Sequence, residues 1–299
     1  MFLIILAYAI LAATFTLAKT VLFYAKPFFT IGFRMTFAGL FLITFQYFFD
    51  RKNAFPKKAD AKLFFKVSLF HIYFAFVLEF WALQSMASSK VSIIYAITPF
   101  IAAALSYFLL KEKLGFRKFW GMILGFSSLF PILILQLNGA EGVEFFRISP
   151  REVILLFAVF SAAYAWFDVK KLMDRGYSLL TINGFAMFTG GLFAFITSAI
   201  FEGIHTSPVF DFWHFVGWLS LLILFSNVVF YNLYGYLLRH YSITFLTFAG
   251  CLTPIFAAFY GYMFLGEAIT YNYFISLGMV MAALYIFYGK QKISFKFKK

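Results

Sequence analysis

Three side chains that can carry a charge lie inside long apolar stretches of the sequence. Glu79 is a carboxylate well inside one stretch, His71 precedes it on the same predicted helix face, and Arg34 lies within another stretch. A charged side chain at the centre of a membrane helix costs about 2.5–3.5 kcal/mol on insertion scales, so it must be paired, protonated or hydrated. Glu79 is therefore a candidate for cation binding or proton coupling, His71 a second coupling candidate, and Arg34 a candidate partner for a substrate carboxylate. A purely structural pairing of Glu79 with Arg34 or Lys19 is the alternative.

Polar aromatic side chains form a second group of candidates. Asn227, Tyr231 and Tyr234 follow one another at i, i+4 and i+7, which places them on one face of a helix. The rings near polar faces can stack on a planar ring of a substrate, such as an aromatic amino acid or a purine; they are Phe80, Trp81, Tyr95, Trp166, Tyr231 and Tyr234. Because the chain contains 48 phenylalanines, packing or lipid contact is the alternative for any single ring.

A proline-containing sequence motif occurs twice in the chain, around Pro99 and around Pro254. Proline lacks a backbone donor and leaves the carbonyl four residues earlier unbonded, here those of Tyr95 and Gly250. Such carbonyls are tolerated at membrane depth where protein, water or ligand satisfies them. Small and polar side chains share a helix face with each proline. We therefore expect Pro99 and Pro254 to kink two helices that line a central cavity; a kink at a packing seam is the alternative.

The elements that must position these residues are membrane helices. The chain is 63% hydrophobic and 12% charged, whereas about 25% charged residues is typical of soluble domains. Apolar stretches of about 20 residues, each long enough to cross a bilayer core, follow one another along the sequence. We predict ten transmembrane helices, at about 2–23, 28–49, 63–84, 91–110, 119–137, 153–173, 178–201, 212–237, 242–265 and 272–289.

The formal charge of +13 is distributed as membrane topology requires. With the N-terminus inside, 19 of the 25 lysines and arginines fall on the internal side, and the external loops hold Lys26, Lys90, Arg147 and Arg151. The charge therefore indicates orientation, and we expect no nucleic-acid partner. The predicted fold class is an all-α polytopic membrane protein with both termini cytoplasmic, in the bacterial inner membrane.

The repeat extends beyond the prolines, since residues 33–41 resemble residues 185–193. Five spans in each half make the second copy enter the membrane from the opposite side, so the two halves are inverted repeats. The predicted organisation is a first five-helix repeat at 1–137, an external connecting loop at 138–152, a second repeat at 153–289 and a basic cytoplasmic tail at 290–299.

Small residues recur in the fifth and tenth predicted helices, as Gly121 and Gly125 in one and Gly278 and Ala282 in the other. This spacing allows two helices to approach closely. The contact is expected inside the protein or, as the alternative, in a homodimer through the fifth and tenth helices.

Acidic residues at helix ends have structural explanations. We expect Asp168 to form a charge pair with Lys170 or Lys171, which follow it closely. Glu112 and Glu267 each end a predicted helix, and we expect each to cap the helix that follows it.

The order of these motifs resembles the EamA-type ten-helix branch of the drug/metabolite transporter superfamily, over essentially the whole chain. The segments that carry the resemblance are Pro27 with Arg34, Phe80-Trp-Ala-Leu83, Thr98-Pro99, Leu110-Lys-Glu112, Ala165-Trp166, Thr253-Pro254 and Leu265-Gly-Glu267. The resemblance implies a basket of helices around a central cavity, with the fifth span of each half at the periphery. It also implies transport of amino acids, nucleosides, or S-adenosylmethionine in exchange for its product.

The predicted function is secondary transport of a small polar metabolite by alternating access, with the substrate and the lipid bilayer as partners. No cofactor and no metal are expected. An intramembrane enzyme is disfavoured, because the chain lacks a His-Glu-x-x-His zinc signature, paired membrane aspartates and a glycine-rich phosphate loop. A membrane scaffold or assembly protein without transport activity is the other alternative.

Overall fold

The computed structural model describes residues 2–51, 54–111, 115–128, 130–131, 149–203, 207–241, 246, 249–269 and 271–288. Glu112, most of the predicted loop 138–152 and the tail 290–299 lie outside the described residues. The described part is helical and contains no β-strand, apart from an isolated bridge between Ala25 and Val209. Seven of its helices are long and apolar enough to cross a membrane, and two further apolar helices are shorter.

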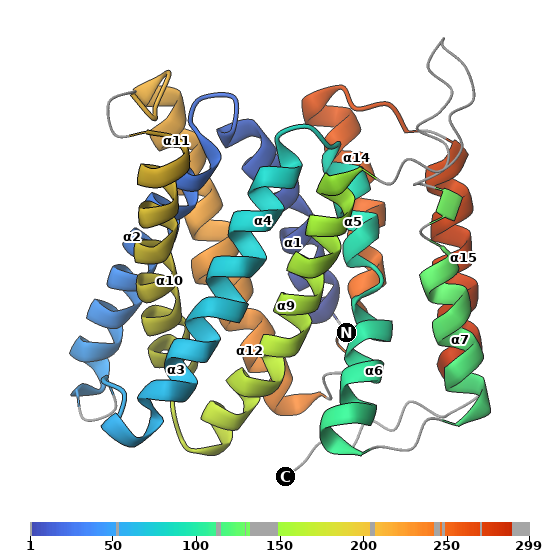
Figure 1. Cartoon of the computed structure of the whole chain (residues 1–299), viewed down its shortest axis with the longest axis horizontal. Coiled ribbons are helices and arrows are strands. Elements are labelled where there is room, and N and C mark those ends of the chain that lie inside the picture. Colours follow the sequence, from blue (N-terminus) through green and yellow to red (C-terminus); the bar gives the residue numbers. More distant parts are fainter. Residues whose placement is uncertain are drawn as a thin grey trace. The chain divides into compact units, whose positions relative to one another are not determined.

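The helices follow the predicted spans closely in the described part (Figure 1). The first half contains α1 (Phe2–Val21), α2 (Pro27–Phe49), η2 (Lys58–Asp60), α3 (Ala61–Val67), η3 (Ser68–Tyr73), α4 (Phe74–Leu83), α5 (Ser88–Tyr95), α6 (Thr98–Leu110) and α7 (Phe116–Ser127). The second half contains α9 (Pro150–Asp174), α10 (Leu179–Phe201), α11 (Phe212–Leu222), η5 (Ile223–Phe230), α12 (Tyr231–His240), η6 (Gly250–Leu252), α14 (Thr253–Leu265) and α15 (Tyr271–Tyr288).

The chain forms two compact units, and each unit takes helices from both halves of the sequence. Unit 1 comprises Met1–Thr16, Met86–Leu156 and Tyr236–Lys299, and unit 2 comprises Leu17–Ser85 and Phe157–Gly235. In unit 2, α2 of the first half packs along α10 of the second half, and in unit 1, α7 packs along α15. Each of these pairs joins helices that occupy equivalent places in the two halves.

Glycines bring α2 and α10 into backbone contact. A Cβ at Gly39 would lie 2.7 Å from the carbonyl oxygen of Gly184, and a Cβ at Gly191 would lie 3.1 Å from that of Gly32. The sequence repeat matches Gly39 with Gly191 and Gly32 with Gly184, so each contact is the repeat of the other. The packing of α2 against α10 is therefore locally two-fold symmetric, which is the arrangement that inverted repeats produce.

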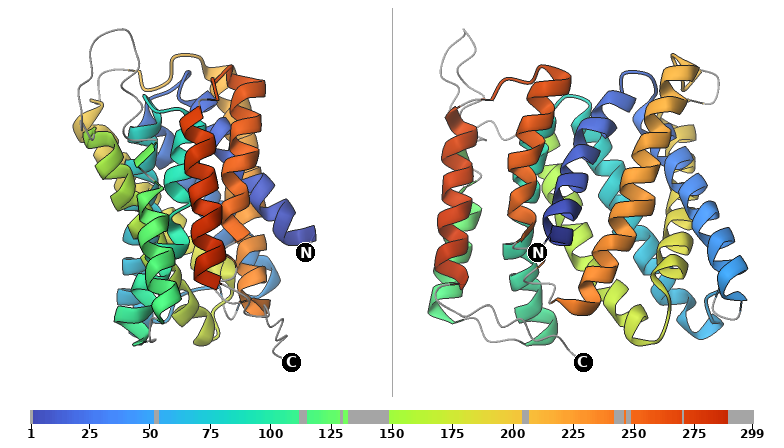
Figure 2. Two further views of the ribbon diagram at one scale, coloured as in Figure 1. Left: turned by 90° about the vertical axis from the view of Figure 1, so that its right-hand side faces the viewer. Right: turned by 180° about the vertical axis from the view of Figure 1, so that it is seen from behind.

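Unit 1 uses glycine in the same way between α7 and α15, which Figure 2 shows side by side. A Cβ at Gly121 would lie 2.7 Å from the Cβ of Phe287, and a Cβ at Gly125 would lie 2.3 Å from the ring of Phe100. Gly121 and Gly125 thus pack within the protein. Gly278 is exposed and has open space around it.

Each of the two prolines lies in the first turn of an α-helix that follows another helical segment, α5 before Pro99 and the 3₁₀ segment η6 before Pro254. Pro99 lies in the first turn of α6, which two residues separate from the end of α5 at Tyr95. The Thr98 hydroxyl donates a hydrogen bond to the Tyr95 carbonyl at 2.5 Å. Pro254 lies in the first turn of α14, and its own carbonyl accepts a hydrogen bond from the hydroxyl of Tyr273. The carbonyl that Pro99 leaves free is therefore satisfied within unit 1, and the expected kink there is a break between two helices.

The third and eighth predicted spans each contain a π-helical segment, η3 and η5. The two segments begin at equivalent positions, because the offset that relates Pro99 to Pro254 also relates Ser68 to Ile223. A π turn holds one residue more than an α turn and is frequent at functional sites. Buried polar residues lie in both segments: Ser68 and His71 in η3, and Ser226 and Asn227 in η5.

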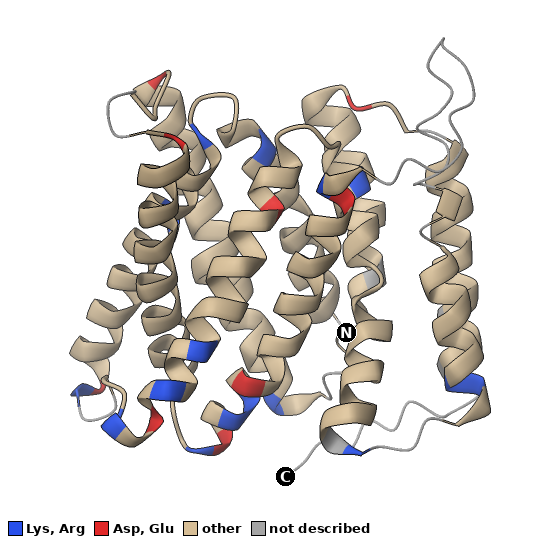
Figure 3. Cartoon of the chain, viewed as in Figure 1, with Lys and Arg blue, Asp and Glu red and all other residues tan. Residues whose placement is uncertain are grey.

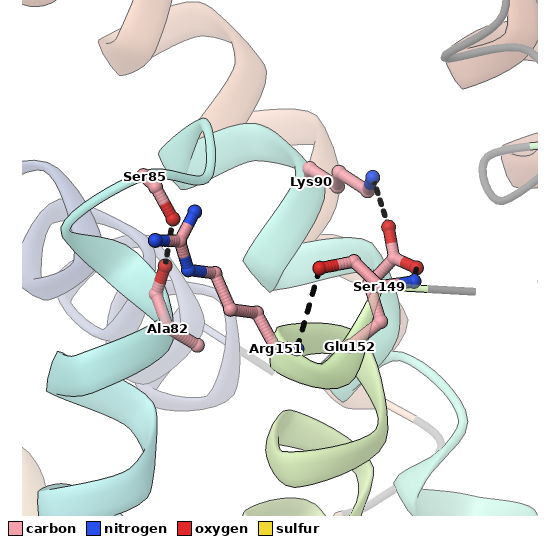
Figure 4. A network of polar contacts seen from close by, with 6 residues as sticks. All are labelled: Ala82, Ser85, Lys90, Ser149, Arg151 and Glu152. Atoms are coloured by element: carbon pink, nitrogen blue, oxygen red, sulfur yellow. Dashed lines mark hydrogen bonds and ion pairs between the residues drawn. The ribbon is translucent and has the colours of Figure 1, made fainter. Parts of the chain in front are cut away.

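The acidic residues at helix ends have partners that are distant in sequence. Glu267 accepts hydrogen bonds from the backbone N–H and the hydroxyl of Ser88, both at 2.8 Å, and from the N–H of Ser89 at 3.2 Å. The carboxylate of Glu267 thus caps the N-terminus of α5, a partner that the sequence did not indicate. Nearby in unit 1, buried Glu152 at the start of α9 pairs with Lys90 of α5 at 2.5 Å (Figure 4).

Charged residues also gather near the lower ends of α3 and α9 (Figure 3). Asp168, which is 2% exposed, pairs with Lys171 and with Lys66, each at 2.9 Å. The predicted pair with Lys171 is confirmed, and Lys66 of α3 is a second partner that the local spacing does not indicate. The carboxylate thereby links the third and sixth predicted spans within unit 2.

Candidate functional site

Arg34 is the centre of the polar interior of unit 2. Its side chain is 1% exposed, Nε donates to Oδ1 of Asn227 at 2.8 Å, and Nη2 donates to the hydroxyl of Ser226. The rings of Phe76 and Phe80 lie 4.9 and 5.6 Å from the guanidinium carbon. These hydrogen-bond acceptors are neutral, so they orient the guanidinium without neutralising its charge. A buried cation held in this way favours a bound anion.

Glu79 lies within electrostatic range of this cation. Glu79 and Tyr231 both interact electrostatically with Arg34, and the Glu79 side chain is 7% exposed. Glu79 comes from α4 and Arg34 from α2, so two candidates identified separately in the sequence belong to one charge system. This proximity fits both the coupling role and the structural pairing considered for Glu79.

His71 lies in a cluster of aromatic rings, here called the aromatic cluster and formed by His71, Trp166, Tyr231 and Tyr234. The His71 ring is 4.5 Å from Trp166 and 5.2 Å from Tyr231 in edge-to-face geometry, and Trp166 is 4.5 Å from Tyr234. His71 is 1% exposed, and neither of its ring nitrogens has a hydrogen-bond partner among the described residues. An unbonded imidazole in this setting is available to a ligand or a proton.

The remaining candidates are distributed over the two units. Trp81 and Lys19 are half-buried in unit 2. Tyr95 is half-buried in unit 1, with its ring 5.4 Å from that of Phe15. The candidates in unit 2 are Arg34, His71, Glu79, Trp81, Asn227, Tyr231 and Tyr234, and those in unit 1 are Tyr95, Pro99 and Pro254.

Two polar residues of unit 2 were not among the sequence candidates. Ser226 bonds Arg34. Asn183 of α10 is fully buried, and neither of its amide atoms has a hydrogen-bond partner among the described residues. The repeat offers a signal for Ser226, which matches His71. Asn183 lies close to the start of its span and is easily taken for an interfacial residue.

Among the described residues, no three His, Cys, Asp or Glu side chains come together in a geometry suited to a metal ion. The residues around Arg34 and His71 offer hydrogen bonds, charge and ring stacking. That set suits reversible binding of an organic ion that carries an aromatic ring.

The apolar spanning helices and the buried polar groups define a polytopic membrane transporter. The family model for the EamA-like transporter family matches residues 1–134 and 151–289. The chain therefore belongs to the EamA-like transporter family and is an integral membrane protein. The family assignment agrees with the resemblance seen in the sequence motifs.

Curated relatives cover nearly the whole chain. The S-adenosylmethionine/S-adenosylhomocysteine transporter of Chlamydia muridarum is 32% identical over 294 residues, covering 97% of this chain and 92% of that protein. The transporter of the same name from Chlamydia trachomatis serovar D is 32% identical, covering 97% and 89%. A WAT1-related chloroplastic protein of Arabidopsis thaliana is 26% identical, covering 90% and 64%. A solved crystal structure with 15% identity and a TM-score of 0.58 covers 95% of this chain and 93% of that chain, which supports the fold.

Proposed function

We propose that this protein exchanges S-adenosylmethionine for S-adenosylhomocysteine across the bacterial inner membrane. The observation that carries the proposal is the 32% identity, over 97% of the chain, to transporters with that printed name. The buried guanidinium of Arg34, held by neutral side chains, supports it independently. Both solutes contain a carboxylate, an ammonium group and an adenine ring, and S-adenosylmethionine carries a sulfonium as well.

Arg34 is the proposed partner of the substrate carboxylate. The planar guanidinium matches a carboxylate with two parallel hydrogen bonds, and Asn227 and Ser226 hold it in place. Glu79 is the proposed partner of the ammonium or sulfonium, because it is the carboxylate in electrostatic range of Arg34. A zwitterionic amino-acid group thus meets one cation and one anion of the protein.

The aromatic side chains are the proposed binding surface for the adenine ring. Within unit 2, Tyr231 and Tyr234 belong to the aromatic cluster, and Trp81 is half-buried. Tyr95 of unit 1 stays a separate prediction from the sequence. Stacking of an aromatic ring contributes about 0.5–1.5 kcal/mol beyond its buried area. His71, with two unbonded ring nitrogens, is the proposed second group for proton coupling beside Glu79.

Alternating access is the proposed mechanism, without ATP. We propose ten spans in two inverted repeats at 1–137 and 153–289, with both termini cytoplasmic. The matched glycine contacts of α2 and α10 support the inversion. The break between α5 and α6 at Pro99 and the junction of the 3₁₀ segment η6 with α14 at Pro254 support bending at equivalent places. Two inverted copies supply two conformations of similar energy, one open to each side.

Exchange in proteoliposomes tests this function. Purified protein is reconstituted with S-adenosylhomocysteine inside, and labelled S-adenosylmethionine is added outside. We expect rapid accumulation of unchanged S-adenosylmethionine that requires internal S-adenosylhomocysteine or S-adenosylmethionine. Empty liposomes and liposomes loaded with adenosine are the controls. Absence of flux would support a scaffold, and recovery of a chemically altered solute would support an enzyme.

A further inference from the structure

Asn183 is a buried amide with no role in the helix packing described above. Its side chain is fully buried in α10, and neither Oδ1 nor Nδ2 has a hydrogen-bond partner among the described residues. Leaving a buried amide unbonded is unfavourable, because the group loses its hydrogen bonds to water and gains none in return. An unpaired group of this kind in a protein interior calls for an explanation outside the fold itself.

Neighbouring residues place Asn183 on the face of α10 that meets the eighth predicted span. One turn before it, Leu179 lies against Gly235, where an added Cβ would come within 2.4 Å of Cδ1 of Leu179. One turn after it, Sδ of Met187 lies 3.5 Å from Nδ2 of Asn227. Residues four apart share a helix face, so Asn183 faces the same neighbour as these two residues.

This placement puts Asn183 level with the aromatic cluster. Leu179 precedes Met187 along α10, whereas their partners Gly235 and Asn227 follow in the reverse order along the eighth span, so the two helices run antiparallel here. Tyr231 lies midway between Asn227 and Gly235 in the sequence. The ring of Tyr231 contacts His71, whose nitrogens are also unbonded. Unit 2 therefore holds two buried, unpartnered hydrogen-bonding side chains at the level of its rings, one turn from the residues that hold Arg34.

We propose that Asn183 is a specificity residue that recognises the N6 and N7 edge of the substrate's adenine. The proposal rests on the exchange of S-adenosylmethionine and S-adenosylhomocysteine put forward above. A carboxamide presents an acceptor and a donor side by side, which matches the N6 amino donor and the N7 acceptor of adenine. Hypoxanthine presents two acceptors at that edge, O6 and N7, so the amide oxygen has no donor to meet. In this conformation the amide is closed to solvent, and adenine reaches it in an open conformation of the cycle.

Competition between two solutes tests this assignment. S-adenosylhomocysteine and S-inosylhomocysteine, which carries hypoxanthine, compete with labelled S-adenosylmethionine in the exchange assay. We expect the wild type to prefer the adenine compound by about 5- to 150-fold, the range for a two-hydrogen-bond contact to adenine. In Asn183→Leu the preference should fall to near one. Its melting temperature should be unchanged or higher, since an apolar group of similar shape replaces an unbonded amide.

Asn232→Leu is the matched control. The side-chain amide of Asn232 donates a hydrogen bond to the carbonyl of Val228, one turn earlier in the same span, at 2.7 Å. Loss of this amide should therefore leave the preference for the adenine compound unchanged. Asn183→Ala provides a second variant if the leucine does not fit. Exchange with an unchanged preference in folded Asn183→Leu or Asn183→Ala overturns the specificity role and leaves the proposed function standing. A wild type without exchange of either compound overturns both.

Discussion

Replacing Arg34 with glutamine tests whether the guanidinium binds the substrate or only stabilises the fold. Among the described residues, the hydrogen bonds of the guanidinium to Asn227 and Ser226 use two of its five N–H donors. A carboxylate bound by the remaining donors forms charged hydrogen bonds, each of which contributes about 1.5–3 kcal/mol. Loss of one such bond weakens binding by about 10- to 150-fold, and loss of two weakens it further.

The same substitution should leave the fold intact. Arg34 is 1% exposed, and its hydrogen-bond partners Asn227 and Ser226 are neutral. Removing the buried cation relieves its desolvation but also takes the opposite charge away from Glu79, so the double variant Arg34→Gln/Glu79→Gln is measured beside Arg34→Gln. The melting temperature of the double variant without ligand should stay near that of the wild type. Arg34→Lys is the control that keeps the charge and loses the planar fork; we expect it to bind more weakly than the wild type and more tightly than glutamine.

Two measurements decide the role of Arg34. Exchange of labelled S-adenosylmethionine in proteoliposomes gives the half-saturating concentration. The rise in melting temperature with added S-adenosylhomocysteine reports binding without transport. An Arg34→Gln protein that transports with wild-type affinity would refute the carboxylate assignment. A variant that unfolds without ligand would instead show that Arg34 belongs to the structural core through its pairing with Glu79.

Three further predictions follow from other parts of the structure. Glu79→Gln should remove any dependence of exchange on external pH and lower the rate at least tenfold; an unchanged pH profile would exclude a coupling role. Gly39→Ala should destabilise by about 1–3 kcal/mol in thermal unfolding, because its Cβ would lie 2.3 Å from a backbone nitrogen of α10, whereas Gly217→Ala meets open space and should not destabilise. Hydrogen bonds from the backbone and ring of His214 lower the pKa of Asp211 below its ordinary value of 3.8. The ionised carboxylate of Asp211 therefore stabilises its helix at pH values above 3.8, and this stabilisation is lost as the pH falls through the lowered pKa. The melting-temperature difference between wild type and Asp211→Ala should therefore be largest near neutral pH and shrink below about pH 4; a difference independent of pH would contradict this role.

Local sequence spacing did not predict the ion-pair and hydrogen-bond partners that come from other helices. Lys171 was found for Asp168 because the two lie one helical turn apart, whereas Lys66 comes from another helix. Glu267 caps α5 at Ser88, 179 residues earlier, a partner that the sequence did not indicate. In a membrane protein every helix is apolar on most faces, so hydrophobic periodicity does not indicate which helices touch.

The π-helical segments show a second limit. Nothing in the residues around His71 or Asn227 separates a π turn from an α turn, because the two differ in which carbonyl each N–H reaches. In the structure, the carbonyl of Phe70 in η3 accepts a hydrogen bond from Ser161 of α9 at 2.7 Å. A neighbouring helix thus satisfies a carbonyl within the π segment, and that neighbour is defined only in the folded chain.

The sequence by itself determined the membrane class, the duplication and the family, because hydropathy, charge placement and repeated sequence motifs are properties of the chain read along its length. It also identified Arg34, Glu79 and His71 as unusual, since a charge in an apolar stretch is costly wherever the stretch packs. Only the tertiary structure decided that Arg34 is held by Asn227 and Ser226 and that His71 faces Trp166. It also showed that the buried amide of Asn183 has no hydrogen-bond partner in the part of the chain that the structure describes. These contacts depend on which helices become neighbours, and that choice rests on close backbone approach at glycines such as Gly39 and Gly191.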